Sequence, residues 1–540
     1  MSARLKQKHA ARKAAPAVPS LADLNMAEAV RFHHAGQFDK AEPLYRAAIA
    51  LKPGNAEAHY NVGLIYHAQN KLPEAVVAFR EAVYAKSDYA DAYANLGTVL
   101  KAQGMKDNAL IFYYQALRLV PLNAQTHSNT GVLLNDLGRS EEAETAFKKA
   151  MVCDPGYEWA YLNFAPCLLD LAAQEASLNA CRRAIALNPK SHMGWYNLAA
   201  SYKTFNRLDD SIDAFRKSIE LRADFGEAHF ALGQMLLTRG DFIEGWKEYD
   251  WRWSLAEYGW MRNIHGEFTA PRWTGEPLAG KTILIFAEQG LGDAIQYVRY
   301  VPRVQAMGGK VVLAVHPPLK PLFAQLAGVE IVSLDQVPLP PYDYQCPLLT
   351  LPMVFKTDRD SIPGNVPYLS ADPAKAERWR ARISGKGLRV GVVWAGNPTQ
   401  KGDRWRSPGL KSVSPVFSVP GVEFVALQMG PGRNDIADNP LPANVQDLGP
   451  EIADFSDTAA IMAGLDLVIS SCTAPLHLAG ALGVKTWAMI PFAPHLLWQL
   501  ERTDSPWYPS LRIYRQDQPG TDWSATIGRM KADLAALAAK

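Results

Sequence analysis

The first half of the chain repeats itself every 34 residues, and no other feature of the sequence constrains the fold as strongly. One column at this spacing holds small residues, as expected where two helices pack closely: Ala29, Gly63, Gly97, Gly131, Ala165, Ala199 and Gly233. A second column of small residues is Ala41, Ala75, Ala109, Ala143, Ser177 and Ser211. A fixed period of roughly 20 to 50 residues is typical of stacked repeats, so the sequence predicts an array of similar units.

Each unit carries the marks of two helices that end before the next unit begins. Mostly large residues, which would fill the space between the helices, recur at Tyr45, Phe79, Tyr113, Phe147, Cys181 and Phe215. Small residues that keep the second helix thin recur at Ala48, Ala82, Ala116, Ala150, Ala184 and Ser218. Proline, which cannot continue a helix, follows at Pro53, Pro121, Pro155 and Pro189. The unit is therefore predicted to be a helix-turn-helix.

This arrangement resembles the tetratricopeptide repeat, which stacks into a right-handed solenoid with a concave groove. The resemblance covers residues 21–255, with six full repeats and a seventh whose second helix runs through Phe242, Trp246 and Tyr249. Such arrays usually hold proteins, so the resemblance implies a protein or peptide partner.

One further column of the array is made of asparagine: Asn61, Asn95, Asn129, Asn163 and Asn197. A carboxamide carries both a donor and an acceptor, so a row of them can bind successive peptide groups of an extended chain. Alternatively, these side chains satisfy backbone groups between neighbouring helices. The column resembles the asparagine ladder of O-linked N-acetylglucosamine transferase, which also joins such repeats to a sugar-transfer domain.

Aromatic residues crowd the end of the array and the following segment, 256–280: Trp246, Tyr249, Trp251, Trp253, Trp260 and Trp273. They predict either a packed interface between the solenoid and the second half, which we favour, or a ligand cage.

The second half is predicted to form two α/β lobes, residues 281–372 and 373–540. Short apolar segments typical of buried parallel strands are 281–286, 311–315, 329–332, 342–346, 388–394, 422–428 and 465–470. Ligands of open α/β sheets bind outside the carboxyl ends of the strands. The loops after Phe286, Trp394, Gln428 and Ser470 should therefore converge on a cleft between the lobes.

The loop after the first strand is the candidate reaction centre. Gly290 and Gly292 allow close approach of the backbone, and the carboxylate of Asp293 could accept the proton of an attacking hydroxyl. The same pattern also fits a simple helix N-cap.

The loop after the 388–394 strand carries Asn397, Lys401, Arg404 and Arg406. Three cations at a strand end suit the charge of a diphosphate leaving group. A solvated basic loop is the alternative, which Asp403 in its midst favours.

A last polar turn, Ser471, Cys472 and Thr473, leads into a helix that contains His477. Free backbone N–H groups at a helix start form an anion site, so this turn is a second candidate for donor binding. His477 could equally be a structural histidine. Gln428, which follows another strand, is a candidate contact for a nucleotide base.

These segments resemble bacterial tetratricopeptide-repeat glycosyltransferases, whose catalytic half is similar to the ADP-heptose lipopolysaccharide heptosyltransferase family with the GT-B fold. The resemblance rests on Gly-Leu-Gly-Asp at 290–293, Trp-Ala-Gly-Asn-Pro at 394–398 and Asp-Leu-Val-Ile…His-Leu-Ala-Gly-Ala-Leu-Gly at 466–483, and continues through Ser-Pro-Trp-Tyr at 505–508. It implies that Asp293 is the base and that Thr473 and His477 face the donor diphosphate.

One departure is Cys472, where that family usually has Asp. A nucleophilic cysteine is a further alternative, with His477 as its one evident base. The Ser-Cys-Thr turn is similar to some flagellin-modifying enzymes of this layout, which implies a protein acceptor such as flagellin or another surface protein.

Composition narrows the class further. Lys and Arg number 56 against 54 Asp and Glu, so a nucleic-acid partner is not expected. Five scattered cysteines fit a reducing cytosol, and no apolar run reaches transmembrane length, so we expect a soluble cytoplasmic protein with a disordered basic tail at 1–20.

The sequence therefore predicts an inverting glycosyltransferase that moves a sugar from a nucleotide-sugar co-substrate to a protein hydroxyl, with no metal or other cofactor. The alternatives are a non-catalytic adaptor with a degenerate GT-B half and a transferase acting on a glycan or lipopolysaccharide. The sequence leaves a homo-oligomer open.

Overall fold

The computed structural model describes residues 19–259, 264, 268, 270–383, 385, 387–400 and 402–539. The predicted tail up to residue 18, Trp260 and Lys401 lie outside the described residues. The chain divides into two compact units between Pro189 and Lys190. This division falls inside the repeat array, ahead of its sixth pair of helices.

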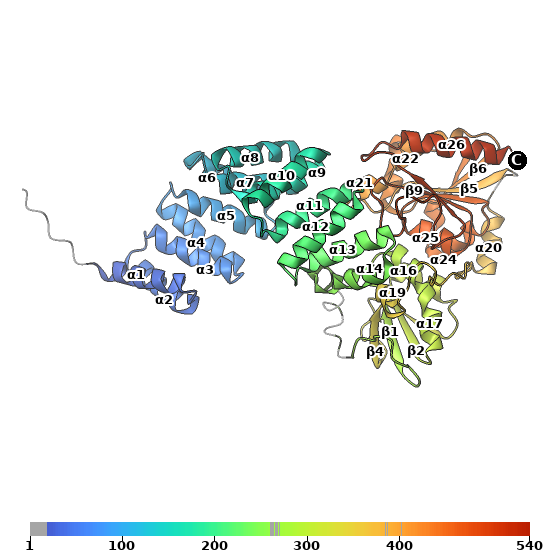
Figure 1. The fold of residues 1–540 in the computed structure, drawn as a ribbon, viewed down its shortest axis with the longest axis horizontal. Coiled ribbons are helices and arrows are strands. Elements are labelled where there is room, and N and C mark those ends of the chain that lie inside the picture. Colours follow the sequence, from blue (N-terminus) through green and yellow to red (C-terminus); the bar gives the residue numbers. More distant parts are fainter. Residues whose placement is uncertain are drawn as a thin grey trace, which may run out of the picture. The chain divides into compact units, whose positions relative to one another are not determined.

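The described part of the array consists of helix pairs (Figure 1). The pairs of the first unit are α1 (Leu21–His34) and α2 (Phe38–Leu51), α3 (Ala56–Ala68) and α4 (Leu72–Ala85), α5 (Ala90–Ala102) and α6 (Lys106–Leu119), α7 (Ala124–Asp136) and α8 (Ser140–Cys153), and α9 (Glu158–Asp170) and α10 (Gln174–Leu187). The second unit begins with α11 (His192–Thr204), α12 (Leu208–Leu221), α13 (Gly226–Arg239) and α14 (Phe242–Tyr249). The predicted all-helical solenoid is confirmed.

The 34-residue columns of small and large residues are contacts between the two helices of a pair. A Cβ atom at Gly63 would lie 2.7 Å from the ring of Phe79, and one at Gly97 would lie 2.8 Å from the ring of Tyr113. Because no side chain larger than hydrogen fits there, the helices approach until the aromatic ring covers the glycine. The 34-residue columns of small and large residues therefore mark the contacts between the two helices of a repeat.

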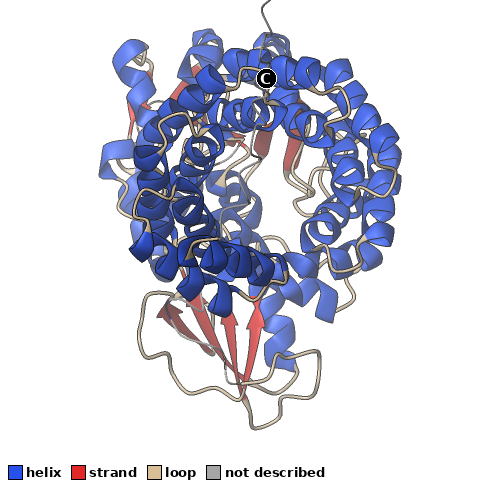
Figure 2. Cartoon of the chain, turned by 90° about the vertical axis from the view of Figure 1, so that its left-hand side faces the viewer, coloured by secondary structure: helices blue, strands red, loops and turns tan. Residues whose placement is uncertain are grey.

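The smaller sheet has four parallel strands in the order β3-β2-β1-β4, visible as arrows at the bottom of Figure 2. The strands are β1 (Thr282–Phe286), β2 (Lys310–Val315), β3 (Val329–Ser333) and β4 (Tyr344–Pro347). The helices of this lobe are α16 (Leu291–Tyr297), α17 (Val301–Ala306), α18 (Lys320–Phe323) and α19 (Leu351–Val354).

The larger sheet has six parallel strands in the order β10-β9-β8-β5-β6-β7. They are β5 (Leu388–Val393), β6 (Val422–Ala426), β7 (Val445–Asp447), β8 (Leu467–Ser471), β9 (Thr486–Ile490) and β10 (Leu511–Arg515). Its helices are α20 (Pro373–Arg380), α21 (Asp403–Arg406), α22 (Gly409–Val413), α23 (Asp435–Asp438), α24 (Phe455–Met462), α25 (Ala474–Ala481) and α26 (Ser524–Ala538). A helical solenoid followed by an α/β region with two parallel sheets agrees with the predicted fold class.

Strand order locates the edge of each sheet where a ligand is expected. The chain places β6 and β7 on one side of β5 and β8 to β10 on the other, so the direction of winding switches between β5 and β8. In the smaller sheet the switch lies between β1 and β4. Crevices form outside the carboxyl ends of strands at such points. The loops after β1, β5 and β8 therefore carry the candidate site.

The aromatic residues after the array form the expected interface. The ring of Trp246, in α14, packs edge-to-face against Tyr297 of the smaller lobe at 6.1 Å and against Trp507 of the larger lobe at 6.3 Å. Beside it, the fully buried Arg252 forms a 2.7 Å ion pair with Glu288, in the loop after β1. The seventh repeat is thus anchored to both lobes.

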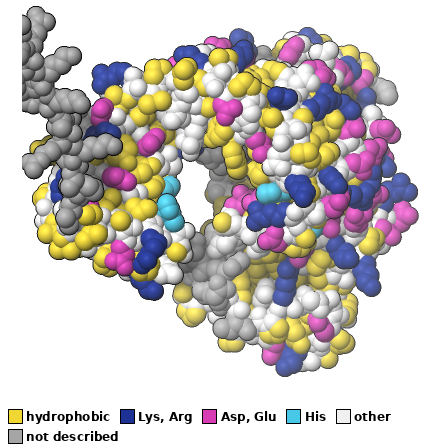
Figure 3. Space-filling view, turned by 60° about the vertical axis from the view of Figure 1, so that its left-hand side comes forward, with side chains coloured by type: hydrophobic (Ala, Val, Ile, Leu, Met, Phe, Trp, Pro, Cys, Tyr) yellow, Lys and Arg dark blue, Asp and Glu magenta, His cyan; other side chains and the backbone are white. Residues whose placement is uncertain are grey.

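Within the described residues, every helix is too short or too polar to span a bilayer. Side chains of both charges are interspersed over the face of the molecule drawn in Figure 3, in keeping with the formal net charge of +2. On this face no broad single-sign surface is present.

Candidate functional site

Asp293 occupies the third position of α16, directly outside the carboxyl end of β1. The Gly290 N–H donates a 3.1 Å hydrogen bond to Asp293 Oδ2, so this carboxylate also caps the helix from inside its first turn rather than from the N-cap position. Burial, and then the nearby charge of Glu288, raise the pKa of Asp293 to about 6. Its side chain remains partly exposed. A carboxylate of this pKa can both take and release a proton near neutral pH.

The two lobes meet directly beside Asp293. A Cβ atom at Gly292 would lie 2.8 Å from His477 Cδ2 and 3.3 Å from the Cα of Ala474. The start of α16 thus touches the first turn of α25, and only glycine permits that approach. The structure therefore brings the predicted base and the predicted donor-binding histidine to one place.

The loop after β5 reaches the same place and is held by a buried carboxylate. Asp403 accepts a 2.9 Å bond from Arg406 Nε and a 3.0 Å bond from the Ser407 hydroxyl, which in turn accepts from the Gly396 N–H. A Cβ at Gly396 would lie 3.0 Å from both Arg406 and Thr473. Gly396 and Arg406 thus lie against Thr473 at the start of α25, whereas Asn397 to Gln400, Gly402 and Arg404 are exposed, so part of the loop is solvated as the alternative expects.

Arg406 is the cation of this loop that affects the pKa values of Asp293 and His477. It holds the pKa of Asp293 down, against the larger effect of burial, and contributes with burial to the low pKa of His477. Arg404 is exposed, and its guanidinium lies 4.5 Å from the centre of the Trp405 ring. Asn397 is exposed as well, and its Oδ1 accepts bonds from the N–H and the hydroxyl of Thr399. Of the four predicted loop residues, Arg406 is the one that the described structure joins to Asp293.

His477 is buried and neutral. Its Nδ1 lies 3.0 Å from the Tyr508 hydroxyl, and its ring stacks on Trp498 at 5.7 Å. Burial, reinforced by nearby cations, lowers the pKa of His477 to about 3. A neutral imidazole can donate or accept a hydrogen bond but carries no charge to a phosphate.

The thiol of Cys472 is a hydrogen-bond acceptor rather than an activated nucleophile. Trp498 Nε1 donates to Cys472 Sγ at 3.1 Å, and burial raises the pKa of the thiol. Since the thiolate is the reactive form, this environment disfavours the nucleophile alternative.

The start of α25 has fewer free N–H groups for an anion than the sequence implies. Pro475 lacks an N–H, and the Leu476 N–H donates to the carbonyl of Thr473 at 3.0 Å. The Thr473 hydroxyl donates to the carbonyl of Ser471 at 3.2 Å. The Ser471 hydroxyl is buried, with no hydrogen-bond partner in the described structure.

Gln428 has a structural role that its sequence position did not reveal. Its Oε1 accepts from the N–H groups of Trp394 and Ala395, and its Nε2 donates to the carbonyls of Ala395 and Met429. Both donors and both acceptor positions of the amide are therefore engaged within the protein. Gln428 fixes the end of β5 and offers no polar atom to a nucleotide base.

The asparagine column divides into two kinds. Asn95 Nδ2 donates to the Tyr60 hydroxyl, and Asn163 Nδ2 donates to the Ser128 hydroxyl, each on the preceding repeat. Asn197 is buried. The side chains of Asn61 and Asn129 have no hydrogen-bond partner among the described residues. Pairing between neighbouring helices thus accounts for Asn95 and Asn163, while Asn61 and Asn129 present their amides for other partners.

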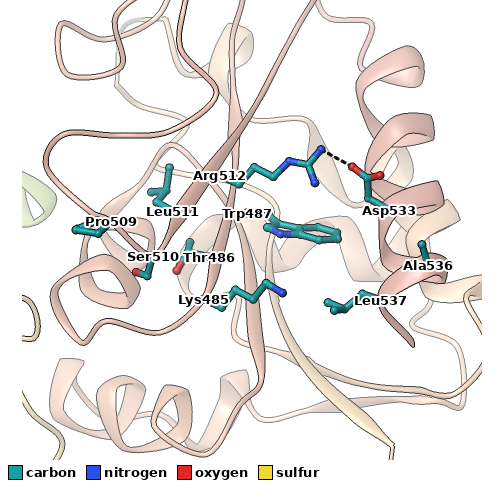
Figure 4. Close-up of a pocket in the computed structure, with 10 residues that line it drawn as sticks. All are labelled: Lys485, Thr486, Trp487, Pro509, Ser510, Leu511, Arg512, Asp533, Ala536 and Leu537. Atoms are coloured by element: carbon teal, nitrogen blue, oxygen red, sulfur yellow. Dashed lines mark ion pairs between the residues drawn. The ribbon is translucent and has the colours of Figure 1, made fainter. Parts of the chain in front are cut away.

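A separate cavity of about 400 Å³ lies between the amino ends of β9 and β10 and α26 (Figure 4). The 2.6 Å ion pair of Arg512 with Asp533 spans it. It is at the sheet edge opposite the loops described above, so it is no part of the crevice.

Sequence reasoning missed two residues that act on the candidate site: the charge of Glu288 raises the pKa of Asp293, and His495 contributes with burial to the low pKa of His477. Glu288 alone had a local signal, since it lies five residues before Asp293 in the same loop.

The helix pairs are tetratricopeptide repeats, and an α/β region follows them. Tetratricopeptide-repeat family models match residues 27–91, 82–158 and 194–225. Protein FlbA of Caulobacter vibrioides (strain ATCC 19089 / CIP 103742 / CB 15) is 31% identical over 343 residues, which are 58% of this chain and 56% of that protein. The chain thus spans little more than half the length of this relative.

Solved structures of repeat proteins resemble part of this chain. A tetratricopeptide repeat protein from Parabacteroides merdae is 18% identical and covers 44% of this chain and 93% of its own, with a TM-score of 0.39. YrrB, described as a repeat protein with an unusual peptide-binding site, is 21% identical over 34% of this chain and 95% of its own, with a TM-score of 0.29.

Proposed function

We propose that this protein is a glycosyltransferase of the GT-B type that transfers a sugar from a nucleotide-sugar donor to a hydroxyl of a protein acceptor. The observation that carries the proposal is the convergence of Asp293, from the smaller lobe, with Arg406 and His477, from the larger lobe, outside the carboxyl ends of two parallel sheets. A general base near a cation at these strand ends fits direct displacement at an anomeric carbon.

In the proposed reaction the acceptor oxygen forms a bond to the anomeric carbon as the bond from that carbon to the donor diphosphate breaks. Asp293 takes the proton of the acceptor hydroxyl, and the configuration at carbon inverts. Arg406 stabilises the charge that develops on the departing diphosphate, and the predicted Lys401 would share this role. His477, held neutral, contributes a hydrogen bond.

The proposed acceptor is a polypeptide bound along the repeat array. Asn61 and Asn129 support this part, because their amides have no hydrogen-bond partner among the described residues and can bind peptide groups. Replacing both with alanine should weaken modification of a protein acceptor without lowering the melting temperature. If transfer to protein is unchanged while a free glycan serves equally well, the acceptor is a carbohydrate instead.

The test of activity begins with a thermal-shift screen against UDP, ADP, GDP, TDP and CMP, since a ligand that binds the folded state raises its melting temperature. Donors built on the binding nucleotide are then assayed with the wild type, Asp293→Asn and Asp343→Asn. Asp343 is the matched control because it bonds Lys281 and the Thr282 N–H at the opposite edge of the smaller sheet.

Loss of transfer in Asp293→Asn alone, with nucleotide binding retained, is the expected result. Equal activity of both variants would remove Asp293 from the mechanism. A wild type that transfers no sugar from any donor, yet still captures protein partners, would support the adaptor alternative.

A further inference from the structure

Arg252 is a fully buried cation at the end of the repeat array, and it bonds the ends of two strands of the smaller sheet. It lies in the 3₁₀ turn Asp250–Ser254, directly after α14. Its Nη2 forms a 2.7 Å ion pair with Glu288, after β1, and donates to the Thr350 hydroxyl, after β4, at 3.0 Å. Because β1 and β4 flank the switch point of this sheet, the turn fixes both strand ends where a ligand is expected.

The charges around Arg252 balance, so this cluster needs no ligand to neutralise it. Asp250 Oδ1 accepts from Arg252 Nη1 at 3.1 Å and from Arg272 Nη2 at 2.6 Å. It also accepts from the Thr350 hydroxyl at 2.8 Å. With Glu288, the cluster sets two carboxylates against two guanidinium groups. Since removing one partner of a buried ion pair leaves an uncompensated charge, these bonds resist displacement of the turn.

A second pair of hydrogen bonds holds the residue that follows Glu288. The hydroxyl of Tyr249, the last residue of α14, donates to Gln289 Oε1 at 3.1 Å and accepts from Gln289 Nε2 at 2.8 Å. The carbonyl of Gln289 accepts from His316 Nε2 at 2.7 Å. Gln289 is thus bonded through its side chain to the seventh repeat and through its backbone to the smaller lobe.

The next residue in the chain, Gly290, bonds the candidate base. Its N–H donates to Asp293 Oδ2 at 3.1 Å, and its carbonyl accepts from the Ala294 N–H at 3.1 Å. Three successive residues, 288–290, therefore carry the ion pair with Arg252, the bonds with Tyr249 and the cap on Asp293. Because these residues are covalently linked, a shift of the first two moves the third.

We propose that Arg252 and Tyr249 are positioning residues for Asp293, so that the seventh repeat belongs to the reaction centre rather than to the part of the array that holds an acceptor. This inference rests on the proposed function, in which Asp293 takes the proton of the acceptor hydroxyl. Neither residue bonds Asp293 itself; both act through the loop 287–290. A base must lie within hydrogen-bond reach of its proton, so a small shift of this loop lowers the rate.

The test uses two full-length variants that keep the charge and most of the bulk of the replaced side chain. Tyr249→Phe removes one hydroxyl. Arg252→Lys keeps a cation opposite Glu288 but loses the planar fork that reaches several acceptors at once. Any effect on the loop then reflects its position and not a change of net charge.

Two arginine and tyrosine bonds elsewhere in the smaller lobe provide the matched controls, Tyr300→Phe and Arg303→Lys. The Tyr300 hydroxyl donates to Thr357 Oγ1 at 3.0 Å, and Arg303 Nη2 donates to the carbonyl of Ser361 at 3.0 Å. Each control therefore removes or weakens a comparable bond to a segment other than the loop after β1.

Hydrogen–deuterium exchange, read by mass spectrometry on peptides spanning 287–294, reports the state of the loop without any substrate. In Tyr249→Phe the amides of Gly290 and Ala294 should exchange about 10-fold faster than in the wild type, as for the loss of one hydrogen bond. Arg252→Lys should change in the same direction, and both controls should match the wild type. Wild-type exchange in both test variants would overturn the inference, as would faster exchange throughout residues 190–540, which would indicate a general loss of stability.

Kinetics separate positioning from donor binding. With the donor that the wild type uses, Tyr249→Phe should lower kcat about 10- to 100-fold and leave the KM for the donor nearly unchanged. Arg252→Lys should retain more activity than Arg252→Met, which leaves Glu288 without its partner. A raised KM with normal kcat in Tyr249→Phe would assign its hydroxyl to donor binding and overturn the positioning role.

Failure of this inference is distinguishable from failure of the proposed function. Wild-type transfer with an equally active Tyr249→Phe overturns the positioning role and leaves the glycosyltransferase in place. A wild type that transfers no sugar from any donor overturns the proposed function and, with it, the positioning of a base.

Discussion

The raised pKa of Asp293 predicts that Asp293→Asn stabilises the protein at pH 8. The carboxyl has a reference pKa of 3.8 and a pKa of about 6 in the fold. Between these values the unfolded chain is ionised while the folded protein stays protonated, so the contribution of this group to stability falls as pH rises from about 4 to about 6. Asparagine imitates the neutral form at every pH.

The magnitude follows from the shift. At about 1.4 kcal/mol per pKa unit, the rise corresponds to about 3 kcal/mol, and partial exposure of the side chain reduces this to about 2 kcal/mol. Thermal melts of the two proteins at pH 4 and pH 8 measure it. The variant should match the wild type at pH 4 and melt a few degrees higher at pH 8, since the amide oxygen can still accept from the Gly290 N–H.

Asp447→Asn is the matched control, because the pKa of Asp447 is shifted in the opposite direction. Bonds from Arg433 hold the pKa of Asp447 below its usual value. Its stabilising effect is therefore present above pH 4 and disappears in acid, so this variant should melt lower than the wild type at pH 8 and approach it near pH 3. A melting difference for Asp293→Asn that is independent of pH, or is negative at pH 8, would refute the assigned environment. If the wild type transfers sugar, kcat/KM should also rise with pH through about 6.

Three further changes test the architecture around the crevice. Gly480→Ala would place a Cβ 2.5 Å from the Tyr508 ring, so we expect a loss of about 1–3 kcal/mol in unfolding free energy, measured by urea denaturation, and a changed His477 side-chain NMR signal. An unchanged signal would contradict the contact. Cys472→Ala should lower the melting temperature slightly and leave any transfer activity at least half intact, because the thiol is protonated; complete loss of transfer would revive the nucleophile alternative. Gln428→Leu leaves buried backbone groups unpaired and should cost about 2–5 kcal/mol of stability by the same denaturation assay without altering which nucleotide raises the melting temperature. A change of nucleotide preference in that variant would restore its predicted role as a base contact.

Much of the fold was predictable because its determining contacts are local and repeated. In most helix pairs of the array a glycine or alanine is followed sixteen residues later by an aromatic residue, as Gly63 is by Phe79, and the 34-residue period repeats this pair along the chain. The strands β1, β2, β5 and β6 were likewise visible as apolar runs. The strands β7, β9 and β10 were not anticipated: β7 has only three residues, and the turn residues that flank the other two, such as Gly483, Pro491 and Pro509, were not used as strand boundaries.

The candidate site also has features that the sequence determined and features that it did not. The sequence alone determined that Asp293 lies at the start of a helix after a buried strand and that polar loops follow other strands, because neighbouring residues determine a strand, a turn and a helix. Only the tertiary structure decided that the Gln428 amide is fully bonded to the backbone, that Asn95 and Asn163 pair with the preceding repeat, and that Gly292 packs against His477. Burial and charge act through space between residues hundreds of positions apart, and no spacing along the chain encodes them.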